Sequence, residues 1–164
     1  MAHPMSTAKK FILTFFLLFF SLPAFADATI KVQLWDNGTE MDLSKNLGMG
    51  LGTGADLSGA MMGIKVDHAR VAPGKVTFDV TNTSNAIVHE MLVAPIKTRD
   101  TKMPFIEVEN RADEEKAGHL GEVSELEPGK SGSLTLTLKP GLYVLYCNVL
   151  GHFMAGMWAV VEVK

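Results

Sequence analysis

Apolar and polar residues alternate with a period of two along much of this chain. In Lys75–Val80 and again in Ser133–Leu138, every second residue is apolar, while Thr, Ser, Asp or Lys occupies most of the positions between. This period is typical of β-strands with one buried face. Eight short β-rich runs separated by turn signals predict an all-β, antiparallel sandwich or barrel: Thr29–Leu34, Gly63–Val66, Lys75–Val80, Ile87–Val93, Phe105–Val108, Ser133–Leu138, Leu142–Cys147 and Met157–Val163.

Two segments interrupt the strand pattern. Asn46–Gly63 is rich in Gly and Met, which predicts a long loop at about 46–63. Asp113–His119 is charged and predicts either one short helix or a loop. Neither segment reads as a linker between domains, so residues 27–164 are expected to form a single domain.

The N-terminus has the order of residues found in secretory signal peptides. Lys9 and Lys10 precede an apolar run at Phe11–Phe20, and Pro23 with Ala24-Phe25-Ala26 follows. We expect residues 1–26 to be cleaved and the remainder to be exported to the periplasm, with no membrane contact afterwards. The alternative is an uncleaved anchor, which the shortness of the apolar run disfavours.

Composition excludes several classes of protein. The 164 residues are 47% hydrophobic and 20% charged, which argues against disorder, and the net charge of −3 without a basic stripe argues against nucleic acid as a partner. A lone cysteine, Cys147, excludes a disulfide within the chain, a zinc ribbon and an iron–sulfur cluster.

The residues that carry chemistry lie near the C-terminus. Cys147, His152 and Met157 follow one another at intervals of five, and His89 lies on an earlier strand, on the same face as other apolar residues. Thiolate, two imidazoles and a thioether are the ligands of a blue-copper site. Taken singly, each of these residues is more often core packing than a ligand, but the combination in an exported protein is far more specific.

These motifs resemble those of the cupredoxins, the type 1 blue copper family. The Cys-x4-His-x4-Met spacing is that of the auracyanin and rusticyanin type, and Asn82-Thr83-Ser84 followed by His89-Glu90-Met91 is similar to small periplasmic copper-binding members. The resemblance covers roughly Gly63–Lys164. It implies a Greek-key β-sandwich that binds one copper ion through His89, Cys147, His152 and Met157.

One position departs from the family pattern. Many electron-transfer members have Asn after the first His, where it braces the cysteine loop, whereas this chain has Glu90. We expect Glu90 either to face solvent or to hydrogen-bond a neighbouring loop.

Weaker metal-binding candidates lie elsewhere. A loose group of thioethers with a nearby imidazole suggests a second Cu(I) site, although packing of a flexible loop on the sandwich is favoured: Met41, Met49, Met61, Met62 and His68. His119 is expected to be a solvated surface residue. The residues around His152 predict either an apolar docking patch or an inward-folded shield: Val149, Leu150, Phe153 and Met154.

The predicted function is that of a periplasmic single-electron carrier with one type 1 copper ion. The alternative is copper sequestration or tolerance on the same fold, with electron transfer incidental. An enzyme is disfavoured because no His-x-His pair occurs, and zinc at the same ligands is disfavoured by the Met. The expected partners are a redox protein such as a cytochrome, or copper-handling proteins, and the chain is expected to be a monomer.

Overall fold

A computed structural model describes residues 27–39, 43–51 and 56–164. The predicted signal peptide, Met41 and part of the Gly/Met-rich segment lie outside these ranges. Within the ranges, no helix is both long enough and apolar enough to cross a bilayer.

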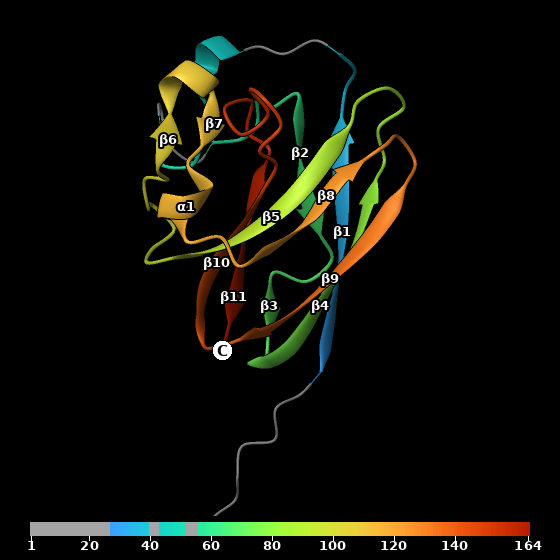
Figure 1. Ribbon diagram of the computed structural model, residues 1–164, viewed down its shortest axis with the longest axis vertical. Helices are drawn as coiled ribbons and strands as arrows, with labels where there is room; N and C mark the ends of the chain where they lie inside the picture. The colour runs from blue at the N-terminus through green and yellow to red at the C-terminus, as the bar shows by residue number, and fades with distance from the viewer. Residues whose placement is uncertain (1–26, 40–42, 52–55) are drawn as a thin grey trace, which may run out of the picture.

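Two sheets pack face to face as a sandwich (Figure 1). The four-stranded sheet has the order β2-β1-β4-β9, and the five-stranded sheet has the order β3-β11-β10-β5-β8. The strands of the first are β1 (Ala28–Asp36), β2 (Met62–Val66), β4 (Gly74–Asn82) and β9 (Ser131–Leu138). Those of the second are β3 (Arg70–Val71), β5 (His89–Ile96), β8 (Gly121–Leu126), β10 (Gly141–Tyr146) and β11 (Trp158–Val163).

A small subdomain lies beside the five-stranded sheet. It holds the short pair β6 (Phe105–Ile106) and β7 (Arg111–Ala112), the 3-10 turn η2 (Glu107–Glu109) and the single-turn helix α1 (Glu114–Ala117). A second 3-10 turn, η1, spans Leu43–Lys45. The predicted strand at Phe105–Val108 is therefore only partly correct, while the helix is one of the two outcomes expected for Asp113–His119.

The sandwich is confirmed, but two strand pairs are parallel rather than antiparallel. β1 pairs with β4 from Ala28↔Val76 to Leu34↔Asn82, and β3 pairs with β11 over two residues. β2 and β4 both adjoin β1, one on each side. Between β2 and β4 the chain passes through β3 of the other sheet, and β4 then runs in the direction of β1.

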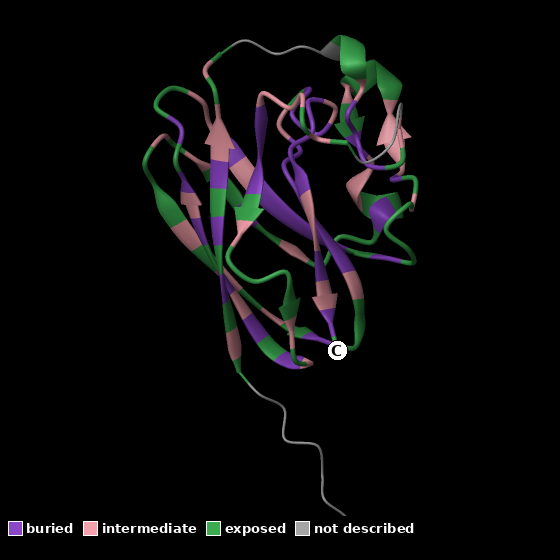
Figure 2. Cartoon of the chain, turned by 180° about the vertical axis from the view of Figure 1, so that it is seen from behind, coloured by how far each residue is buried: buried purple, intermediate pink, exposed green. Residues whose placement is uncertain are grey.

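The five-stranded sheet is buried on both faces, as the purple bands of Figure 2 show. Between the sheets lies the inner cluster, whose members include Ile30, Leu34, Phe78, Met91, Val93, Leu145 and Val161. On the opposite face lies the outer cluster, whose members include Met49, Leu92, Ala94, Met103, Val144, Tyr146, Phe153 and Trp158. Burying each large apolar side chain contributes about 1.5–3 kcal/mol, so both clusters stabilise the fold.

The two ends of the sandwich differ. The start of β1 and the C-terminus lie at the lower end in Figure 1, and the loop from β10 to β11 lies at the upper end. That loop carries the residues with the strongest chemical signal.

Candidate metal centre

Three of the predicted ligands meet in one buried place. The Nδ1 atoms of His89 and His152 are 3.2 Å apart, and the Cys147 Sγ lies 3.4 Å from the His152 Nδ1. The potential ligand atoms of all three residues lie within 4.8 Å of one another. The exposed fractions are 0% for His89 and Cys147 and 3% for His152. The site is thus shielded from water before any ligand is considered.

Strand ends position these side chains. His89 is the first residue of β5 and faces the inner cluster with Met91 and Val93, as the alternation predicted. Cys147 directly follows β10 and Met157 directly precedes β11. The Cys147 N–H donates to the Met157 carbonyl at 3.1 Å, which extends the ladder between the two strands by one step.

The loop between Cys147 and Met157 is folded by its own backbone hydrogen bonds. The His152 N–H donates to the Val149 carbonyl at 2.9 Å, and the Met157 N–H donates to the His152 carbonyl at 3.0 Å. Gly156 has a φ of +97°, and a Cβ there would lie 3.1 Å from the Ala60 side chain. Glycine is therefore needed at this turn both for its backbone conformation and for close packing.

Met157 is fully buried in the inner cluster beside Cys147. Its backbone joins those of Cys147 and His152. The structure thus places all four predicted residues at one end of the sandwich, and the ligand role of each stays a prediction.

Burial sets the protonation of the site. It lowers the pKa of His89, against the opposing effect of Asp36, and lowers the pKa of His152 to about 4. Burial also raises the pKa of the Cys147 thiol to about 12. Near neutral pH both imidazoles therefore have free lone pairs, whereas the thiol must lose a proton before it can bind a cation.

Asp36 is a site residue that sequence reasoning missed. It ends β1 in the opposite sheet, and its Oδ2 lies 2.9 Å from the His89 Nε2. A carboxylate there accepts the Nε2–H, which leaves the lone pair on the Nδ1 that faces His152 and Cys147. Its only sequence signal was an Asp-Asn-Gly turn motif, and that motif gives no indication of a partner on β5.

Glu90 braces the cysteine loop, one of the two outcomes expected for it. Its Oε1 accepts the Asn148 N–H at 3.1 Å, and its own N–H points to the Cys147 Sγ at 3.5 Å. Burial, followed by the charges of Glu122 and Glu114, raises the pKa of Glu90 to about 7.

Asn148 is a second residue that the sequence did not single out. It is 2% exposed. Its Oδ1 accepts the Ala112 N–H at 2.7 Å, and its Nδ2 donates to the Ala112 carbonyl and to the Glu114 Oε1 at 3.0 and 2.8 Å. Asn148 therefore ties the residue after Cys147 to β7 and α1.

The Gly/Met-rich segment packs on the outer face of the five-stranded sheet. The Trp158 Nε1–H donates to the Leu47 carbonyl at 2.7 Å, and a Cβ on Gly48 would lie 3.0 Å from the Phe153 ring. Met49 belongs to the outer cluster and Met62 to the inner one, so these two buried sulfur side chains lie on different faces of the sheet.

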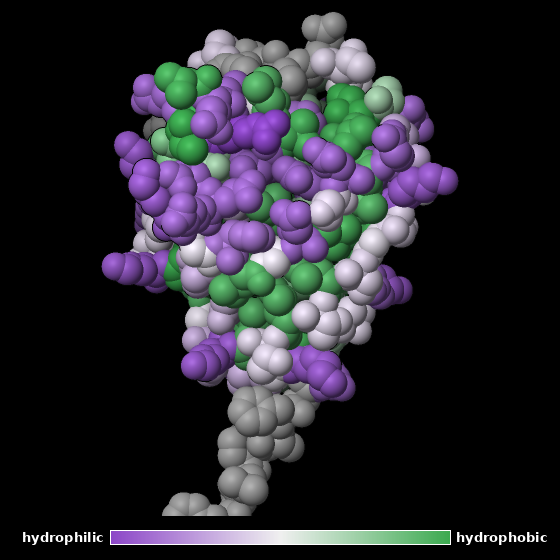
Figure 3. Space-filling model, in the orientation of Figure 1, coloured by the Kyte–Doolittle hydropathy of each residue, from purple (hydrophilic) through white to green (hydrophobic). Residues whose placement is uncertain are grey.

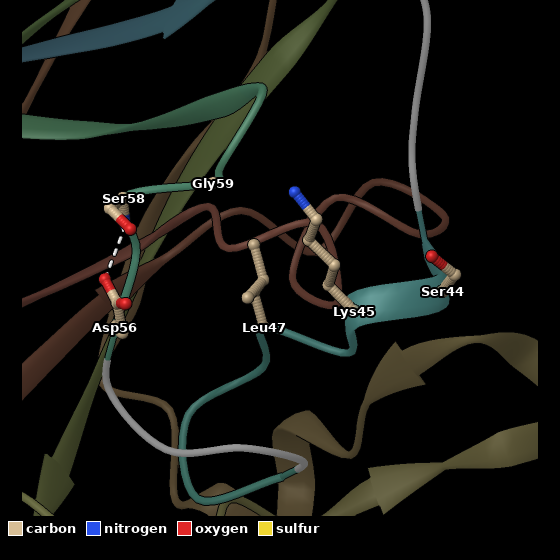
Figure 4. Close-up of a pocket in the computed structure, with 6 residues that line it drawn as sticks. All are labelled: Ser44, Lys45, Leu47, Asp56, Ser58 and Gly59. Carbon is tan, nitrogen blue, oxygen red and sulfur yellow. Dashed lines mark hydrogen bonds between the residues drawn. The ribbon is translucent and has the colours of Figure 1, made fainter.

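A pocket opens within this segment (Figure 4). Its lining residues carry no thioether and are Ser44, Lys45, Leu47, Asp56, Ser58 and Gly59. The Ser58 N–H donates to the Asp56 Oδ1 at 2.9 Å. The described part of the segment therefore matches the packing interpretation better than a second Cu(I) site.

The apolar residues around His152 divide between the two interpretations. Phe153 folds fully into the outer cluster, and its ring lies 6.0 Å from that of Tyr146. Val149 and Met154 are partly exposed, and Leu150 is 55% exposed. Shielding and surface display thus coexist in one loop.

Comparisons with known proteins find similarity in structure rather than in sequence. No protein-family model matches the chain, and no curated protein matches it. Rusticyanin from Thiobacillus ferrooxidans is similar at 16% identity and a TM-score of 0.53, over 83% of this chain and 76% of that one. A second structure of rusticyanin, described as a copper protein, gives 15% identity and a TM-score of 0.53 over the same shares.

Auracyanin from the photosynthetic bacterium Roseiflexus castenholzii is 19% identical, with a TM-score of 0.46, over 84% of this chain and 96% of that one. The likeness to rusticyanin shows the fold, and the chain has the cupredoxin β-sandwich.

Proposed function

We propose that this protein holds one copper ion at His89, Cys147, His152 and Met157 and carries single electrons in the periplasm. The observation that carries the proposal is the convergence of two imidazole Nδ1 atoms and a thiol Sγ in a site that is almost fully buried. The rusticyanin structure described as that of a copper protein shares the fold and supports the same assignment.

The chemistry of the donor set fits copper. Thiolate and thioether suit Cu(I), imidazole serves both oxidation states, and a trigonal His₂Cys site with a weak axial Met is the blue-copper arrangement. Zn²⁺ accepts the same Cys and His ligands, but a thioether gives it no useful fourth ligand. Bound copper would supply a one-electron couple between Cu(I) and Cu(II).

The chain's own residues prepare the site. The Asp36 carboxylate holds the His89 ring, and Glu90 with Asn148 fixes the loop that follows Cys147. The Cys147 thiol gives up its proton on metal binding, so uptake should release a proton and strengthen as pH rises. Burial excludes water, and the protein performs no bond-making chemistry.

Copper sequestration remains the alternative. The full burial of His89, Cys147 and Met157 favours retention of an ion over its delivery, because no ligand is open to a competing chelator. Retention alone fits both functions. Reversible voltammetry with fast electron exchange with a cytochrome would support the carrier. Tightly held copper without reversible redox behaviour would support sequestration.

The test is a Cu(II) titration followed by visible absorption. The protein should develop an intense thiolate-to-copper band that saturates at one equivalent, and Cys147→Ser should lack it. Met157→Leu should change the band positions and the potential, whereas Met154→Leu, in the same loop but partly exposed, should change neither. A colourless protein, or a spectrum that Cys147→Ser leaves unchanged, would refute the proposal.

A further inference from the structure

A second cluster of potential ligands lies on the other side of the five-stranded sheet. The side chains of Glu114, His119 and Glu122 each place a ligand atom within 4.8 Å of the other two. Hydrophilic side chains gather over α1 on the face seen in Figure 3. This cluster has no thiol and shares no residue with the candidate copper ligands, although Glu114 accepts a hydrogen bond from Asn148 in the loop after Cys147.

The backbone brings the three residues together. Glu114 begins α1, the helix ends at Gly118 with a φ of +68°, and the His119 N–H donates to the Glu114 carbonyl at 3.2 Å. The Leu120 N–H then donates to the Val93 carbonyl of β5 at 2.8 Å, which fixes the start of β8 and with it Glu122.

Both carboxylates are oriented by hydrogen bonds, since the Glu122 Oε1 accepts from the Ser124 hydroxyl at 2.7 Å. His119 and Glu122 are 33% and 37% exposed, and the His119 Nε2 lies 4.0 Å from the Glu122 Oε2. Glu114 accepts one hydrogen bond from the Asn148 Nδ2 at 2.8 Å, which orients its carboxylate. Ligand atoms around Zn²⁺ lie at about 2.0–2.2 Å from the ion, so rotation of the exposed side chains would have to close the cluster by about 1 Å.

A buried hydroxyl lies on the same face of the five-stranded sheet as Glu122. Tyr146 is fully buried, and among the described residues its phenol oxygen has no hydrogen-bond partner. Tyr146 lies opposite Leu92, which lies opposite Glu122, so the three residues form one row across β10, β5 and β8. Burial, followed by the charges of Glu114, Glu90 and Glu122, raises the pKa of the Tyr146 phenol. An unpaired buried hydroxyl is costly unless something completes its environment.

The carboxylates also lack a Lys or Arg partner among the described residues. In the described part of the chain, no Lys or Arg nitrogen lies within 4.0 Å of Glu90, Glu114 or Glu122, and the nearby Lys116 pairs with Asp113 at 2.7 Å instead. Like charges held together disfavour one another, so a bound cation would relieve their repulsion.

We propose that Glu114, His119 and Glu122 bind a divalent first-row transition metal ion, with Zn²⁺ as the representative ion. One imidazole nitrogen and two carboxylate oxygens form a common ligand set for such ions, and solvent completes the coordination on the exposed side. The absence of sulfur distinguishes this site from the copper site, and the proposal does not depend on copper binding. His119, expected from sequence to be a solvated surface residue, is here a ligand.

The test is a calorimetric Zn²⁺ titration of the purified protein loaded with one equivalent of copper under reducing conditions. We expect one Zn²⁺ to bind, and His119→Ala and Glu122→Gln each to weaken binding by about tenfold or more. The matched control is His68→Ala, because His68 is also an exposed histidine next to a carboxylate, the Asp67 Oδ1 at 3.1 Å. This control should bind Zn²⁺ as the unaltered protein does.

A residue-level readout avoids any effect of substitution on folding. In the unaltered protein, Zn²⁺ should shift the NMR signals of the His119 ring and of the Glu114 and Glu122 backbone, and leave the His68 ring in place. The proposal is wrong if no Zn²⁺ binds, if His119→Ala binds it as tightly as the unaltered protein, or if the shifts map elsewhere.

Discussion

The two faces of β5 perform different tasks at the same end of one strand. On the inner face His89 and Met91 are fully buried, and the His89 imidazole meets the ligands of the candidate copper site. On the outer face Glu90 is only partly exposed, and it lies among carboxylates next to an apolar cluster. Successive residues of a strand point to opposite sides, so adjacent residues enter separate environments.

Burial selects the chemistry of each site. The inner site is closed to water, holds neutral imidazoles and a neutral thiol, and is braced by groups from both sheets. The outer site is half open and rich in carboxylates. A closed site with soft ligands suits an ion that stays bound, whereas an open site with oxygen ligands suits an ion that exchanges.

The largest expected effect tests whether the outer cluster stabilises the fold. Leu92→Ala would remove a fully buried side chain from the outer cluster and should lower the free energy of unfolding by about 2–5 kcal/mol. Urea unfolding measures this. Val108→Ala, at a side chain that is 95% exposed, should change it by less than about 0.5 kcal/mol. Equal effects of the two substitutions would mean that the outer cluster does not support the fold.

A smaller effect is expected on the inner face, where Asp36 contacts His89. Asp36→Asn keeps the shape of the side chain but removes the charge that holds the His89 ring, and copper affinity should fall by about 10- to 100-fold. Competition with a chelator of known affinity measures this. Asp67→Asn, at an exposed aspartate that pairs with His68, is the matched control and should leave the affinity unchanged. An unchanged affinity in Asp36→Asn would remove Asp36 from the site.

The smallest effect is a pH dependence on the outer side. The pKa of Glu90 is raised from 4.5 to about 7 in the folded protein. Between these pH values the folded protein keeps the proton that the unfolded chain has lost, so the free energy of unfolding falls as pH rises. In the metal-free protein, Glu90→Gln should therefore become more stable relative to the unaltered protein from pH 4.5 to pH 7 and level off above.

The free energy of unfolding is measured for Glu90→Gln and for the unaltered protein at each pH. The histidines are the same in both proteins, so their contribution cancels in the difference. Glu127→Gln, at an exposed glutamate, is the control, and its profile should run parallel to that of the unaltered protein. A difference between Glu90→Gln and the unaltered protein that does not vary with pH would show that Glu90 titrates as an ordinary carboxyl group.

Much of the sandwich could be predicted from alternation, and the exceptions have physical reasons. β8 was missed because Val123 is its only buried residue, because two of its six residues are glutamates and because a third glutamate, Glu127, follows it. β3 and β7 were missed because two-residue strands carry no period. The parallel pairing of β1 with β4 depends on where the chain crosses between sheets, which residue patterns do not encode.

The candidate site also contains residues that the sequence predicts and residues that it does not. Cys147, His152 and Met157 lie in one short segment, so their spacing alone indicates a common centre. Asp36 reaches His89 from the opposite sheet, across 53 positions of sequence, and Asn148 acts through contacts with Ala112 and Glu114. Such contacts form only when the sheets pack, so the sequence predicts the candidate ligands but not the residues that hold them.

The position of the ends of the sandwich has a practical consequence. The start of β1 and the C-terminus lie at the end opposite the loop that carries Cys147 and His152 (Figure 1). A tag or tether joined at Lys164 would therefore attach the protein to an electrode or bead with the ligand loop facing the solution. Immobilised in that orientation, the loop would remain open to soluble proteins, while the bare electrode would lie a full strand length from the metal centre.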